Sequence, residues 1–76
     1  MLQDFEELIN SLHGNKKAVL TLRDKDEFIL YREIGTISDI RQLNIEALIS
    51  QYRPNWIFIS DSKSPLPAVF MLEPPN

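Results

Sequence analysis

The chain has no cysteine among its 76 residues, so it forms neither a disulfide nor a thiolate metal site. Glycine is almost as scarce, with two copies, and none follows Gly35. A phosphate-binding loop uses glycines so that backbone N–H groups can approach the ligand. The hydroxyl-rich segment 60–64 lacks them, and we therefore interpret it as a polar hairpin loop and not as a phosphate site.

Long apolar runs and an excess of positive charge are also missing. No apolar run approaches the ~20 residues that cross a bilayer, so we expect no membrane association. Eight basic residues against eleven acidic ones give a net charge of −3, which weighs against nucleic acid as a partner. The N-terminal segment 1–7 is acidic and has no basic n-region, so it does not resemble a secretory signal. We expect a cytoplasmic protein.

What is present is typical of one small globular domain. The residues are 43% hydrophobic and 25% charged, which is too apolar for a disordered chain. We predict a single domain over residues 1–72 and a frayed C-terminal tail over residues 73–76. Chains of this length bury a small core and are often marginally stable, so self-association would help to stabilise the fold.

The segment from Ala18 to Ile34 is the centre of the predicted fold. Two β-favouring runs flank the charged break Asp24–Glu27, which predicts a β-hairpin. Residues 2–12 have apolar side chains at helical spacing and stop at Gly14, so they predict a helix. In the second strand of the hairpin, alternation places Phe28, Leu30, Arg32 and Ile34 on one face.

Residues 38–52 are helical in pattern, with an offset near Asn44. One bent helix or two short helices would explain the offset, and the bent helix is preferred. Residues 56–60 predict a buried, central strand and residues 68–72 predict the last strand. The order αββαββ predicts an α+β fold, with a mostly antiparallel four-stranded sheet and two helices on one face. The predicted core comprises Phe5, Leu8, Ile9, Leu12, Leu20, Leu22, Phe28, Leu30, Ile40, Leu48, Ile49, Tyr52, Phe58 and Phe70.

No spacing in the sequence is typical of catalysis, of a metal site or of a cofactor site. The carboxylates of segment 24–27 are too close together for a calcium loop and suit a solvated turn. His13 has no neighbouring partner for catalysis and suits a helix C-terminus. Trp56 could stack a nucleic-acid base, but its apolar strand favours a place in the core. We therefore expect a protein that is not an enzyme and that binds no cofactor.

The strands carry more apolar residues than two helices can cover on one face of the sheet. A half-solvated antiparallel sheet normally alternates apolar and polar residues, which these strands do not do. The apolar strand residues that the helices do not cover would form a patch that needs a partner. That partner would be either a second copy in a homodimer or an unidentified protein. A helix on each face is the alternative arrangement. The candidate interface residues are Val19, Ile29, Tyr31, Ile57, Ile59, Val69 and Met71.

A second hypothesis assigns residues 36–52 to a winged-helix-like domain that binds nucleic acid. Residues 38–43 and 45–52 would be a helix pair, and the last two strands would be the wing. The second helix begins with apolar residues and Glu46, and few basic residues lie nearby. These residue types favour a protein-interaction module or small regulatory subunit over a nucleic-acid-binding domain.

Overall fold

The computed structural model describes residues 2–61 and 64–72 and has an α+β fold. The predicted tail, 73–76, lies outside the described residues. One antiparallel sheet has the strand order β2-β1-β3-β4, so β1 and β3 are its inner strands, as predicted for residues 56–60. The elements follow the chain as α1 (Gln3–Ser11), β1 (Lys17–Arg23), β2 (Ile29–Thr36), α2 (Ile37–Arg41), α3 (Ile45–Tyr52), β3 (Trp56–Asp61) and β4 (Ser64–Met71).

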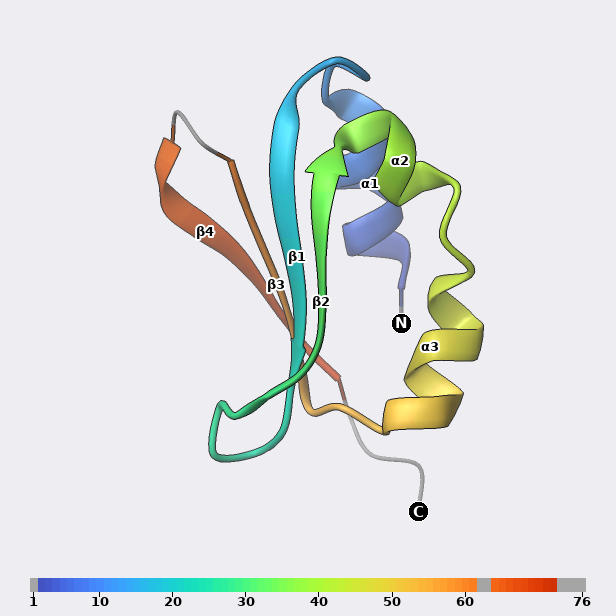
Figure 1. The fold of residues 1–76 in the computed structure, drawn as a ribbon, viewed down its shortest axis with the longest axis vertical. Helices are drawn as coiled ribbons and strands as arrows, with labels where there is room; N and C mark the ends of the chain where they lie inside the picture. Colours follow the sequence, from blue (N-terminus) through green and yellow to red (C-terminus); the bar gives the residue numbers. More distant parts are fainter. Residues whose placement is uncertain (1, 62–63, 73–76) are drawn as a thin grey trace.

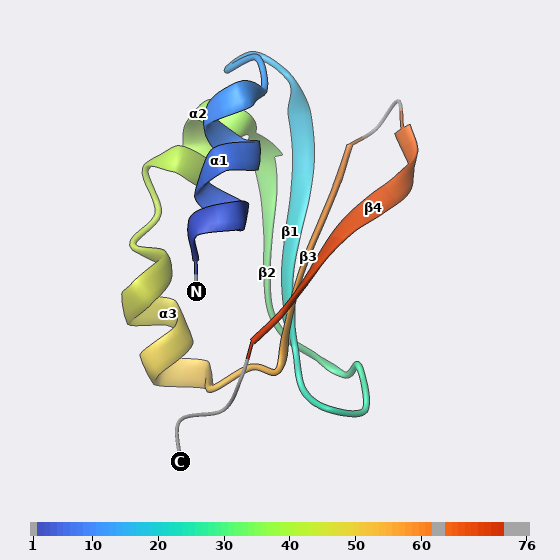
Figure 2. The same cartoon turned by 180° about the vertical axis from the view of Figure 1, so that it is seen from behind.

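All three helices lie on the same side of the sheet (Figures 1 and 2). The arrangement with a helix on each face is therefore wrong, and the preference for one bent helix over 38–52 is wrong as well. Two caps divide that segment. The Thr36 hydroxyl accepts from the Asp39 amide and the Asp39 carboxylate accepts from the Thr36 amide, which begins α2. The Asn44 side chain accepts from the Ala47 amide and begins α3.

Gly35 and Arg41 stabilise two helix ends, the start of α2 and the end of α1, respectively. A Cβ atom at Gly35 would lie 2.7 Å from the Asp39 carboxylate, so the glycine leaves room for the cap of α2. The Arg41 Nε and Nη2 atoms donate to the Ile9 carbonyl at 3.2 and 3.0 Å, and Nη2 also donates to the Leu12 carbonyl. The guanidinium thus satisfies carbonyls at the end of α1 that have no partner within the helix.

The core fills the space between the sheet and the helices. Its sheet-side members Leu20, Leu22 and Ile57 are fully buried. α3 contributes only partly buried side chains, and the Tyr52 ring of α3 packs against the Tyr31 ring of β2 with centroids 5.4 Å apart. The buried apolar residues are Phe5, Ile9, Ala18, Leu20, Leu22, Ile37, Ile40, Ile57, Ile59 and Leu72.

Three predicted core residues do not lie in this core. Phe28 and Leu30 are exposed, and Phe58 is partly buried on the opposite side of the sheet from the helices. In β2 the row assigned to the core was the wrong one, because Tyr31 and Glu33 face the helices. The β1–β2 register is also irregular, since Leu22 pairs with Tyr31 whereas Arg23 pairs with Ile29. Leu30 is the additional residue, and such a bulge interrupts the simple alternation along the strand.

Candidate functional site: the open face of the sheet

The side of the sheet that faces away from the helices has no element of the described chain packed on it (Figures 1 and 2). We call it the open face. Its residues follow from the register, because residues paired across antiparallel strands point to the same side. The open face comprises Lys17, Val19, Thr21 and Arg23 of β1, Ile29, Arg32 and Ile34 of β2, Trp56, Phe58 and Ser60 of β3, and Val69 and Met71 of β4.

An arginine and two aromatic rings form a cluster on the inner strands of the open face, at the end where β1 finishes and β3 begins. The Arg23 guanidinium lies 3.9 Å from the centroid of the Phe58 ring, and its Nε donates to the Thr21 hydroxyl at 3.1 Å. The Trp56 ring meets the Phe58 ring edge to face, with centroids 6.5 Å apart. Because Arg23 packs over it, Thr21 is buried although no helix covers this side. This arginine and aromatic cluster is therefore preformed and well packed.

Exposed aliphatic side chains lie on the outer strands to either side of this cluster. Ile34 on β2 is 63% exposed and Met71 on β4 is 68% exposed, and Ile29 and Val69 are exposed as well. They belong to the two outer strands, whereas the aromatic residues belong to an inner strand. A continuous set of apolar side chains without cover is a feature of interaction surfaces.

The charged residues of the open face, within the described part of the chain, all carry positive charge. They are Lys17, Arg23 and Arg32. The whole chain has a net charge of −3, so its acidic residues are concentrated elsewhere. This separation makes the open face attractive to an anionic surface.

The seven residues predicted for the interface divide between the two sides of the sheet. Val19, Ile29, Val69 and Met71 lie on the open face. The placement of Ile57, Ile59 and Tyr31 on the same side is wrong. Ile57 and Ile59 are buried under the helices, and Tyr31 faces the helices, where it packs on α3. β3 is apolar on both sides, so alternation could not show which half of it faces the core.

Sequence reasoning missed five residues that help to form the open face: Ile34, Phe58, Trp56, Arg23 and Arg32. One signal could have found two of them. In the second strand, the row of side chains that was assigned to the core contained Arg32. An arginine is rarely buried unless it is paired. Reversing that row would have moved Ile34 and Arg32 outward and Tyr31 inward, as observed.

The helix side of β2 carries one polar pair. The Tyr31 hydroxyl donates to the Glu33 carboxylate at 2.7 Å. This hydrogen bond, together with partial burial and the negative charge of Glu33, raises the pKa of Tyr31 above its ordinary value. The pair accounts for polar residues on the covered side of an edge strand.

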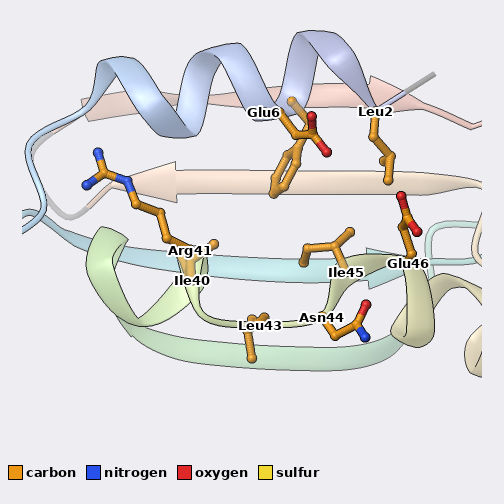
Figure 3. Close-up of a pocket in the computed structure, with 9 residues that line it drawn as sticks. Leu2, Glu6, Ile40, Arg41, Leu43, Asn44, Ile45 and Glu46 are labelled. Carbon is orange, nitrogen blue, oxygen red and sulfur yellow. The ribbon is translucent and has the colours of Figure 1, made fainter.

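A cavity of about 240 Å³ lies between the start of α1 and the connection from α2 to α3. Figure 3 shows Glu6 and Glu46 facing this hollow, with Arg41 pointing toward the other end of α1. Glu6 and Glu46 lie in the first turns of α1 and α3, where carboxylates stabilise the helix dipole. That role explains both residues, so the cavity does not indicate a ligand.

Other classes of site find little support in the described residues. No group of three or more His, Cys, Asp or Glu side chains could hold a metal ion there. Within residues 2–61 and 64–72, no helix has the length and apolarity that a membrane crossing requires. The exposed side of α3 carries Glu46, Ala47, Ser50 and Gln51, which offer no positive charge to a phosphate backbone.

Comparison with protein-family models, with curated proteins and with solved structures found no match to this chain. Its function therefore has to be inferred from the chemistry of the open face.

Proposed function

We propose that this chain is a non-catalytic protein-interaction module that forms a homodimer through the open face. The observation that carries the proposal is the uncovered set of aliphatic side chains, above all Ile34 and Met71, on the same face as a preformed arginine and aromatic cluster. In a two-fold dimer the same face of each copy would cover the other, so a single surface satisfies both partners.

The residue types support a protein partner more than a nucleic acid. Trp, Phe, Met and Arg are enriched in the cores of protein interfaces, and Trp and Arg are frequent among the residues that dominate binding. All four types occur on the open face. A single-stranded nucleic acid would need aromatic faces free for stacking, whereas Arg23 already covers Phe58. The exposed aliphatic residues offer a base no such stacking surface.

The open face alone is smaller than a standard protein interface. Four strands about 4.8 Å apart, each about 23 Å long over seven residues, give roughly 440 Å² of flat area per copy. A standard interface buries about 800 Å² of accessible surface per partner. The accessible surface of the side chains is larger than this flat area. The gap between roughly 440 and about 800 Å² is still large enough that we expect residues beyond the open face to contribute to the interface.

Sedimentation velocity over a range of micromolar concentrations tests the proposal. The wild-type chain should change from the 8.8 kDa monomer to twice that mass as concentration rises. Ile34→Glu should remain monomeric, because the exposed apolar side chain on the outer strand β2 would be replaced by a carboxylate that dimerisation would have to desolvate. Ala47→Glu is the matched control, since Ala47 is an exposed apolar residue on α3, away from the open face. It should dimerise like the wild type.

Three results would overturn the proposal. The first is a wild-type chain that stays monomeric at every concentration, and the second is an Ile34→Glu variant that dimerises normally. The third is salt-dependent binding of a fluorescent single-stranded or duplex oligonucleotide that Arg32→Glu abolishes, which would assign the open face to nucleic acid.

A further inference from the structure

The connection between β1 and β2 is a loop whose shape is set by hydrogen bonds to Asp24. We call residues 24–28 the tip. The Asp24 carboxylate accepts from the amides of Asp26 and Phe28, each at 2.9 Å, and the Asp24 amide donates to the Phe28 carbonyl at 3.0 Å. The Glu27 amide donates to the Asp24 carbonyl at 2.9 Å. Four hydrogen bonds to one aspartate therefore hold the loop in a single shape.

The tip also contains an unfavourable backbone conformation. Glu27 has a φ of 66°, a left-handed conformation that a residue with a side chain adopts at some cost. A tight hairpin of this kind usually has glycine at that position. Side chains retained in such conformations are concentrated at sites where the local shape has a role. Here the left-handed residue directly precedes Phe28 and so sets the direction in which the chain continues.

Phe28 is the most exposed large apolar residue of the described chain, at 69%. In both views the tip bends away from the helices, toward the side of the open face (Figures 1 and 2). The end of the hairpin thus carries an aromatic side chain that is largely exposed. Such a ring would gain considerably from burial in a partner.

The tip and the open face have opposite charges. The tip contains three carboxylates and one ammonium group, from Asp24, Lys25, Asp26 and Glu27. The charged residues of the open face, among those described, are Lys17, Arg23 and Arg32. One chain therefore carries both halves of a complementary pair. This complementarity favours a second copy of the chain as the occupant over an unrelated protein.

We propose that the tip of each copy docks on the open face of the other, with Phe28 as its apolar anchor. The inference rests on the proposed homodimer and adds to it the element that supplies the missing contact area. Two-fold symmetry makes each contact occur twice and closes the assembly at two copies. The carboxylates of Asp26 and Glu27 would lie near the cations of the partner's open face.

A charge exchange tests this arrangement. The tip variant is Asp26→Lys with Glu27→Lys, and the face variant is Lys17→Glu with Arg32→Glu. Asp24 is left unchanged because it builds the loop. Each variant alone would bring like charges together in both contacts, so its dimer Kd should rise about tenfold or more. In an equimolar mixture both contacts become complementary again, and a heterodimer should form.

Sedimentation of each variant and of the mixture, with circular dichroism to confirm folding, distinguishes the outcomes. A tip variant that dimerises with the wild-type Kd overturns the role of the tip and leaves the proposed dimer intact. Two monomeric variants that fail to combine also overturn it. A wild-type chain that is monomeric overturns the proposed function itself. Phe28→Ser is the uncharged companion, and its Kd should also rise about tenfold.

Discussion

Truncation of Ile34 to alanine tests quantitatively whether the open face is buried in a dimer. Ile34 is held in place by β2, and its side chain is largely exposed in one copy. The substitution removes three carbon atoms, each worth about 0.8 kcal/mol when it is fully buried. In the single copy 63% of the residue is still exposed, so about 1.5 kcal/mol per copy would be gained only on dimerisation. Two copies lose about 3 kcal/mol, which corresponds to a Kd about 100-fold higher.

The assay is a sedimentation-equilibrium titration of wild type and Ile34→Ala, with urea unfolding measured at a concentration where both are monomeric. The free energy of unfolding of the monomer should fall by only about 1 kcal/mol, because the smaller part of the side chain is buried within one copy and alanine favours a strand less than isoleucine does. A Kd within about twofold of the wild type would refute the reasoning, since dimerisation would then leave Ile34 in water.

Three further predictions concern the fold. Ile57→Ala should lower the free energy of unfolding by about 3 kcal/mol in urea titrations, because Ile57 is fully buried under the helices; a loss below about 1 kcal/mol would contradict its placement. Glu27→Gly should raise that free energy by about 0.5 kcal/mol, since relief of the left-handed conformation exceeds the entropy cost of glycine. The raised pKa of Tyr31 predicts that stability falls as pH rises above about 10, because the unfolded chain loses this proton before the folded chain does. Urea titrations at increasing pH should show a smaller fall in Tyr31→Phe, and an unchanged slope would contradict the role of the hydrogen bond to Glu33.

Local signals in the sequence were sufficient for the class of the fold. The hairpin around residues 24–27, the first helix and the inner position of residues 56–60 were all predictable. They depend on turn residues, helical spacing and continuous apolarity, which act over short stretches of chain. The caps at Thr36 and Asn44 were also visible as residue types, although the choice between one bent helix and two was not.

The side on which each strand buries its residues depended on contacts between distant segments. Ile57 and Phe58 are adjacent and similarly apolar, and only pairing with β1 determines that Ile57 faces the helices. The bulge at Leu30 likewise arises from the register between two strands and has no distinct residue signature. The expected apolar side without helices is present, but the placement of Tyr31, Ile57 and Ile59 on it was wrong, and its use as an interface stays a prediction.

The strand order has a consequence for how the chain reaches its folded state. β1 and β2 are close in sequence and can form a hairpin early, but the other edge of β1 pairs with β3, which lies in the last third of the chain. Closure of so long a connection costs entropy before any contact repays it, so we expect this step to limit the folding rate. During synthesis, the inner edge of β1 would remain unpaired until residues 56–61 have left the ribosome.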